Sequence, residues 1–296
     1  MAGYRNRFIQ LFHQIGKFIP NNILTGITGQ RMILPVYHLV SDHELPHIKH
    51  LYPIKNSHQF ELDLDYLLTY YEPLSFHELL EIIQFGRTIS KNYFLLSFDD
   101  GLREFNDVIA PVLIKKGVPA ICFLNCDFID NKDLFYRYKA SILIEELILR
   151  KIINTRSEIQ RVLKEIPGSD MRAQLLQITY GERYLLDKIA DLIDLSYKSF
   201  LKKEKPYLTS EQIKSLIAKG FHFGAHSKDH PDYASLTLEE QLDQTQGSMR
   251  AVQELFSLDY GLFAFPFTDY GVSATFFEKI FQKGDGVDLT FGSAGL

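Results

Sequence analysis

The sequence lacks tryptophan, and it has two cysteines and no long apolar run. Cys122 and Cys126 are too few for a disulfide framework, and their apolar surroundings favour buried free thiols, with a metal or redox pair as the alternative. No stretch reaches the roughly 18 apolar residues of a membrane-spanning helix. The net charge of -5 shows no excess of basic residues, so we expect no nucleic-acid partner.

Residues 1–30 are predicted to form an N-terminal region built on an amphipathic helix. Arg5 and Arg7 precede apolar residues that recur from Phe8 to Ile19, and polar residues interrupt the run at Gln10, His13, Gln14 and Lys17. A signal peptide would need an unbroken apolar stretch and a small-residue cleavage site. We therefore expect a cytoplasmic protein whose helix docks on the chain itself. Peripheral contact with a membrane surface, or contact with a partner, is the alternative.

Residues 31–129 alternate between strand and helix signals. The apolar runs 32–37, 93–98 and 119–124 indicate buried strands, with helix signals between them. Strands that alternate with helices imply a mainly parallel sheet covered by helices, which is an α/β architecture.

This alternation stops over residues 130–206, where several helices and no convincing strand are expected. We interpret this segment as a helical insertion that is either a structural flap or a lid for a substrate or partner. The α/β pattern resumes over residues 207–296, which we expect to form the second part of the same domain. Its last expected strand, 289–291, lies close to the end of the sequence.

Two groups of polar residues follow expected strands. Asp99 and Asp100 come directly after 93–98, and His226 and His230 follow a strand at 221–225. Functional groups collect beyond the C-terminal ends of parallel strands. One carboxylate with two imidazoles is a common ligand set for a catalytic zinc, and it leaves one coordination position open. Because adjacent side chains diverge, one aspartate is expected to bind the metal while the other accepts a proton.

These residues resemble the signature motifs of a known family. Ser97–Gly101 (Ser-Phe-Asp-Asp-Gly) and His226–His230 (His-Ser-x-x-His) are similar to the first two motifs of the polysaccharide deacetylases, also called the NodB-homology or carbohydrate esterase 4 group. The resemblance covers about 32–128 and 207–296. It implies a distorted (β/α) barrel, here carrying a helical insertion. It also implies a divalent metal, zinc first with cobalt, nickel or manganese as alternatives, and removal of N-acetyl groups from an amino-sugar glycan.

The same resemblance implies a role for each matching position. Asp99 would be the general base, and Asp100, His226 and His230 the metal ligands. Ser227 would orient the site. Tyr37 and His38 resemble a frequent Tyr-His pair in such proteins. The residues expected to line the substrate site are Tyr37, His38, Pro266, Phe267 and Asp269, and those expected to support it are Ser227, His222 and Arg103.

The sequence also departs from the family pattern. Ala264 stands where the third motif usually has an arginine that holds the base, although some branches have alanine there; Arg103 is a candidate replacement. The tryptophan of the fourth motif is missing, and no histidine follows His230 to serve as the general acid of the fifth. Either the domain is truncated after 289–291 or another group protonates the leaving amine, with His38 and His222 as candidates.

Three functions fit these observations. The first is a metal-dependent hydrolase that removes N-acetyl groups from an amino-sugar glycan or its precursor. The second is a non-catalytic glycan-binding protein that retains the metal site. The third is a hydrolase of a non-sugar amide, since a fold does not determine its substrate. Asp99 favours catalysis, because a binding protein would need only the metal ligands.

Overall fold

The computed structural model describes residues 21–152, 157–282 and 286–293. The N-terminal segment expected to be amphipathic thus lies mostly outside the described residues, which begin with helix α2 (Asn21–Thr28). Its docking, its membrane contact and the cytoplasmic location stay predictions. Within the described ranges, every helix is too short or too polar to cross a lipid bilayer.

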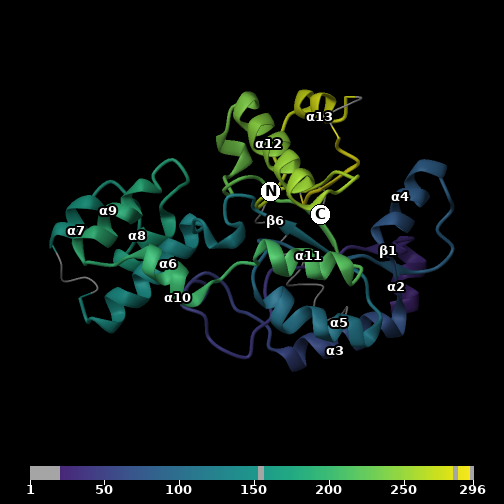
Figure 1. Cartoon of the computed structure of the whole chain (residues 1–296), viewed down its shortest axis with the longest axis horizontal. Coiled ribbons are helices and arrows are strands. Elements are labelled where there is room, and N and C mark those ends of the chain that lie inside the picture. The colour runs from purple at the N-terminus through teal and green to yellow at the C-terminus, as the bar shows by residue number, and fades with distance from the viewer. Residues whose placement is uncertain (1–20, 153–156, 283–285, 294–296) are drawn as a thin grey trace.

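The body of the protein is a parallel sheet that curls into a half-barrel (Figure 1). Every neighbouring pair of strands in this sheet is parallel. The strands follow one another in chain order: β2 (Val36–Tyr37), β5 (Leu96–Phe98), β6 (Ala120–Leu124), β7 (His222–Ala225), β8 (Leu262–Ala264) and β9 (Leu289–Phe291). A smaller parallel sheet has the order β1 (Met32–Ile33), β4 (Tyr93–Phe94) and β3 (Glu72–Pro73), and its strands β1 and β4 lead directly into β2 and β5. The expected α/β architecture of the distorted (β/α) barrel type is confirmed, and the sheet curls only part of the way round.

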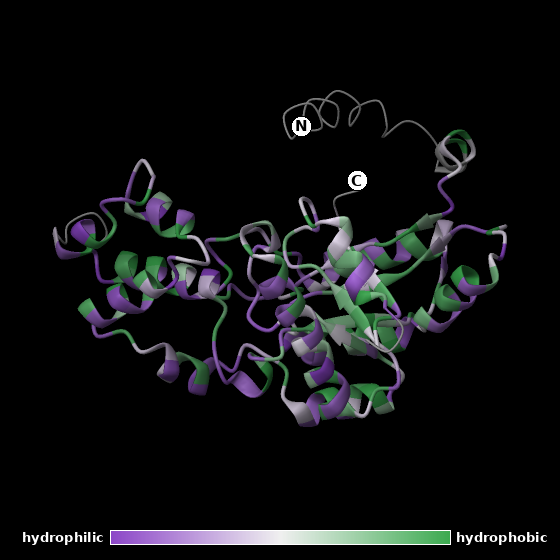
Figure 2. Cartoon of the chain, turned by 90° about the horizontal axis from the view of Figure 1, so that it is seen from above, coloured by the Kyte–Doolittle hydropathy of each residue, from purple (hydrophilic) through white to green (hydrophobic). Residues whose placement is uncertain are grey.

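The two faces of the sheet have separate apolar cores, because side chains alternate along each strand. On β6, Ala120 and Cys122 belong to the outer core, whereas Ile121 and Phe123 belong to the inner one. The outer core packs under helices α3 (Ser57–Tyr70), α5 (Ala110–Lys116), α11 (Ser210–Ala218), α12 (Leu238–Phe256) and α13 (Ala274–Ile280). Helix α4 (Phe76–Phe85) closes one end of the inner core. In Figure 2 the strands of the body are mostly hydrophobic, while its helices carry both colours.

The helical segment lies to one side of the barrel (Figure 1) and has its own apolar core. Its helices are α6 (Tyr136–Leu149), α7 (Ser157–Val162), α8 (Met171–Gln177), α9 (Tyr184–Leu192) and α10 (Tyr197–Glu204). The described part of 130–206 contains no strand. Short non-α helices are η1 (Phe105–Ile109), η2 (Ile129–Asn131) and η3 (Tyr233–Ser235). Cys122 is buried and Cys126 partly buried, and both are free thiols.

Candidate functional site

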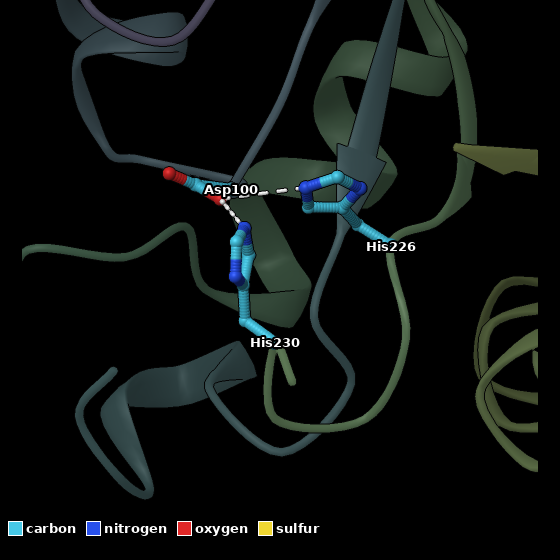
Figure 3. Close-up of side chains that lie close together, drawn as sticks. All are labelled: Asp100, His226 and His230. Carbon is cyan, nitrogen blue, oxygen red and sulfur yellow. Dashed lines mark ion pairs between the residues drawn. The ribbon is translucent and has the colours of Figure 1, made fainter. Parts of the chain in front are cut away.

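Three side chains from the carboxyl ends of β5 and β7 point toward one another (Figure 3). The Nε2 atom of His226 lies 3.7 Å from Oδ1 of Asp100, and Nε2 of His230 lies 3.3 Å from the same oxygen. One ligand atom from each residue falls within 4.8 Å of the other two, and all three residues are buried. The strand ends therefore bring a carboxylate and two imidazoles to one point.

Unusual backbone conformations place these side chains. Asp100 has φ 72° and His230 has φ 64°, both in the left-handed region that costs a non-glycine residue about 1–3 kcal/mol. Gly101 follows with φ 61°, and a Cβ there would come within 2.7 Å of Leu124 Cδ2. A glycine is thus required beside Asp100.

Hydrogen bonds fix the orientation of the His226 imidazole and the backbone position of His230. Nδ1 of His226 lies 2.9 Å from the backbone carbonyl of Ala264, so a proton on Nδ1 leaves the Nε2 lone pair facing Asp100. The backbone amide of His230 donates to Ser227 Oγ at 3.0 Å. Asn125, which belongs to no sequence motif, donates from Nδ2 to the carbonyl of His226. It thereby ties the end of β6 to the loop that carries both histidines.

A residue of the helical segment also reaches the site. The hydroxyl of Tyr138, on α6, donates a 2.7 Å hydrogen bond to Oδ2 of Asp100. Both side chains are buried, so this bond is shielded from water. No motif singled out Tyr138, because the contact depends on how α6 packs against the barrel.

The donor set fits a divalent transition metal. Oδ1 of Asp100 and Nδ1 of His230 are buried with no hydrogen-bond partner among the described residues. The Oδ1 lone pairs are therefore available to a metal ion. Around a tetrahedral zinc ion with bonds of about 2.0–2.2 Å, ligand atoms lie about 3.4 Å apart. The separations of 3.3 and 3.7 Å are close to that value. One oxygen and two imidazole nitrogens suit zinc and its neighbours in the first transition row.

The protonation states also agree with such a site. Burial, together with the charge of His230, lowers the pKa of His226 to about 3, so its imidazole is neutral, as ligation requires. Burial acts to raise the pKa of Asp100, but the electrostatic interaction with His230, whose Nε2 lies 3.3 Å away, outweighs it and holds that pKa below its usual value. Asp99 differs: burial raises its pKa to about 6, and the Asp100 carboxylate acts in the same direction.

Asp100, His226 and His230 line a cavity of about 640 Å³ on the inner face of the half-barrel. Asp99 and His38 line it together with the three clustered residues. Its walls are largely apolar and include Leu34, Val36, Tyr52, Phe123, Phe135, Phe267 and Phe291. A concave, mostly apolar pocket with a few converging polar groups has the character of a small-molecule binding site. We call it the catalytic cavity below.

Of the expected substrate residues that follow β8, one lines this cavity and two do not. Phe267 lines it, with its ring 4.6 Å from that of His230 and nearly perpendicular to it. Pro266 is buried and does not line the cavity. The carboxylate of Asp269 lies against Gly292, where a Cβ would come within 2.4 Å of it, and Gly292 rather than Asp269 is a lining residue.

Three expected residues are placed elsewhere, and this corrects the roles given to them. Tyr37 donates to Asp63 at 2.7 Å, on the α3 side of the sheet. His222 begins β7, at the opposite end from His226, and its ring packs 4.9 Å from that of His77. Arg103 donates to the Glu204 carbonyl at 2.7 Å and ion-pairs with Asp107, so it holds the end of α10 rather than Asp99.

Comparison with solved structures gives the same fold at low sequence identity. The Streptococcus pyogenes deacetylase PplD in complex with acetate superimposes with a TM-score of 0.57 and 14% identity, covering 88% of this chain and 83% of that one. IcaB from Ammonifex degensii gives 0.56 and 16% identity, with coverages of 89% and 84%. The BpsB deacetylase domain from Bordetella bronchiseptica gives 0.50 and 12%, with coverages of 89% and 88%. No curated protein matches the chain.

A family model carries the assignment further than these fold similarities. The model described as polysaccharide deacetylase matches residues 86–279. That span is more than half of the chain, and it contains Asp99, Asp100, His226 and His230. With motifs, half-barrel and clustered side chains in agreement, the chain belongs to the polysaccharide deacetylase family.

Proposed function

We propose that this protein is a metal-dependent hydrolase that removes N-acetyl groups from an amino-sugar glycan or glycan precursor. The observation that carries the proposal is the Asp99 carboxylate. It lines the catalytic cavity beside the three clustered residues, and its Oδ1 has no hydrogen-bond partner among the described residues. A protein that only bound a glycan would need the metal ligands but no second, uncommitted carboxylate.

Asp100, His226 and His230 would hold the divalent ion, with zinc as the first choice and cobalt, nickel or manganese as alternatives. When bound, such an ion supplies Lewis acidity to the amide carbonyl and to the attacking water. Asp99 accepts the proton of that water as its oxygen adds to the carbonyl carbon. A pKa near 6 suits this role, because the carboxylate is ionised at neutral pH yet basic enough to take a proton.

His38 is our candidate for the general acid. It lines the catalytic cavity, and its charge is close enough to act on the pKa of Asp99. His222, the other sequence candidate, packs against Phe76 and His77 away from the cavity. We therefore assign to His38 the delivery of a proton to the amine as the C–N bond breaks, which leaves acetate and a free amino sugar.

Release of acetate from N-acetylated oligosaccharides tests this function. The zinc-reconstituted protein is expected to release one acetate for each amine formed, and Asp99→Asn is expected to be inactive while still binding oligosaccharide. Binding without acetate release in the unaltered protein would instead favour the glycan-binding alternative. Hydrolysis of simple amides but of no sugar amide would favour the non-sugar alternative.

A further inference from the structure

The catalytic cavity has a polar part and an apolar part. The lining side chains that carry a charge or an imidazole come from loops after the carboxyl ends of strands or from α6: His38, Asp99, Asp100, Arg137, His226 and His230. Much of the remaining wall is hydrocarbon. We call this part the apolar trough and define it by Leu34, Val36, Phe123, Ala264 and Phe291.

The apolar trough runs down the inner face of the half-barrel from the candidate metal site. Leu34, Val36 and His38 are two positions apart in the chain, and all three line the cavity. Val36 pairs with Ser97, two positions before Asp99, so its side chain lies one repeat below the level of the proposed base. From His38 to Leu34 an extended chain spans about 13 Å, at about 3.3 Å per residue.

Two aliphatic residues of the apolar trough are exposed. The exposed fraction is 44% for Leu34 and 52% for Val36. Among the described strands, β2 has β5 as its neighbour on one side and none on the other, so these side chains stand at an open edge of the sheet. Exposed apolar surface that adjoins a concave site is typical of a surface that binds an apolar group.

The floor of the apolar trough is closely packed. The Phe123 side chain is buried, and its ring centre lies 5.2 Å from that of Phe291. A Cβ at Gly224 would come within 2.7 Å of the Phe123 ring, so this glycine lets β7 approach the ring closely. Ala264 packs in the same inner core and stands where the family pattern usually has an arginine, whose long side chain would project into the cavity. The small residue thus leaves the trough open.

A sugar ring fits this hydrocarbon surface poorly. Its hydroxyl groups would leave water and find few hydrogen-bond partners, which costs free energy. Ser97 offers one hydroxyl at the edge of the apolar trough, and Oγ of Ser293 already donates to the Phe267 carbonyl at 3.4 Å. An alkyl chain has no polar groups to satisfy, and each CH₂ group that it buries strengthens binding about fourfold. The chemistry of the trough therefore favours an alkyl chain.

Resting on the proposed function, we propose that the apolar trough binds the acyl chain of the substrate, so that the protein also hydrolyses amino sugars whose N-acyl group is longer than acetyl. The amide carbonyl lies at the candidate metal site, the alkyl chain extends along Val36 and Leu34, and the sugar stays on the polar side. The oxygen of water adds to the carbonyl carbon, the C–N bond breaks, and the nitrogen takes a proton. The products are an alkyl carboxylate and the free amino sugar.

An acyl-chain series tests the apolar trough, using glucosamine and its β-1,4-linked trisaccharide, each N-acylated with acetyl, butanoyl or hexanoyl groups. For the zinc-reconstituted wild type, kcat/KM is expected to rise at least about tenfold from acetyl to hexanoyl. Leu34→Asn replaces an alkyl wall with an amide of similar size and should remove most of that rise. Leu62→Asn makes the same change at an exposed position of α3 outside the cavity and should keep the rise of wild type.

Calorimetry with the zinc-loaded Asp99→Asn variant separates binding in the apolar trough from hydrolysis. Affinity that rises with acyl length in Asp99→Asn, and that loses this rise when Leu34→Asn is added, supports the trough even if no amide is cleaved; the proposed hydrolysis alone would then fail. Hydrolysis of acetyl substrates without any gain for butanoyl or hexanoyl would overturn the trough and leave the proposed function standing. A gain that Leu34→Asn retains, or no binding of any N-acyl sugar, would also overturn it.

Discussion

Tyr138 donates a 2.7 Å hydrogen bond to the Oδ2 oxygen of Asp100, and so joins the helical segment to the candidate metal site. The opposite oxygen of that carboxylate faces His226 and His230. Partners of this kind orient a ligand and tune its basicity. The segment that interrupts the barrel in sequence therefore contributes directly to the site that the barrel forms.

Removing this hydroxyl should weaken metal binding. We expect Tyr138→Phe to lower zinc affinity about tenfold, since loss of such a partner typically costs 10–100-fold. Competition with a chromogenic chelator measures the affinity, and thermal unfolding of the metal-free protein checks the fold. Tyr197→Phe is the matched control, because its hydroxyl donates to the Lys139 carbonyl and not to the site. An unchanged zinc affinity in Tyr138→Phe would show that the bond has no role at the metal.

Asp99→Asn separates catalysis from metal binding. The amide is nearly isosteric but cannot take a proton, so turnover should fall at least about 100-fold, the usual scale for loss of a general base. The metal content should equal that of wild type, because Asp100, His226 and His230 remain. Metal loss in Asp99→Asn would mean that both aspartates are ligands, and retained turnover would remove Asp99 as the base.

His38→Asn tests the general acid by comparing two substrates. An N-acetyl sugar has a poor amine leaving group that must be protonated, whereas p-nitrophenyl acetate has a leaving group that departs without a proton. We expect a loss of about 100-fold for the amide and a much smaller loss for the ester. His222→Asn should leave both rates near wild type, since His222 lies beside Phe76 and His77. Equal losses on both substrates in His38→Asn would exclude the acid role.

His47 should make the fold less stable in mild acid. It is 2% exposed between the rings of Tyr138 and Phe200, and burial together with the charge of Arg103 lowers its pKa to about 3. Between about pH 6.5 and pH 3 the unfolded chain binds a proton here that the folded chain does not, so stability falls as the pH falls.

The His47 contribution is measured by urea unfolding of the metal-free protein at pH 7.5 and pH 5.5. With an unfolded pKa near 6.5, wild type should lose about 1.4 kcal/mol more than His47→Phe over this interval. His58→Phe, at an exposed position on α3, should lose as much as wild type. The same loss in His47→Phe as in wild type would show that His47 is not buried in its neutral form.

Local sequence signals predicted what depends on local structure. Ser75 and Glu78 form a capping box at the start of α4, a short Ser-x-x-Glu pattern in which each side chain needs only a backbone amide within one helical turn. The motif residues Asp100 and His226 meet because parallel strands end at one edge of the sheet. The parallel α/β sheet likewise followed from strands that alternate with helices, whereas its barrel-like curvature was expected only from the family resemblance.

The positions of the other site residues depend on tertiary contacts, which local sequence patterns do not specify. Tyr37 and His38 are adjacent, and neighbouring side chains on a strand face opposite sides, so only His38 lines the cavity. His222 does share a face with His226, but it stands at the other end of the strand. The bond from Tyr138 spans 38 positions and depends on where α6 packs, which no periodicity specifies.

The most direct test of the account is the metal content of protein purified without chelator, measured by elemental analysis in wild type and in Asp100→Ala. We predict about one equivalent of zinc or a similar ion in wild type and less than a tenth of that in the variant, with Asp99→Asn as the full-occupancy control. Absence of metal from wild type even after zinc is added back, or an unchanged content in Asp100→Ala, would contradict the proposed site.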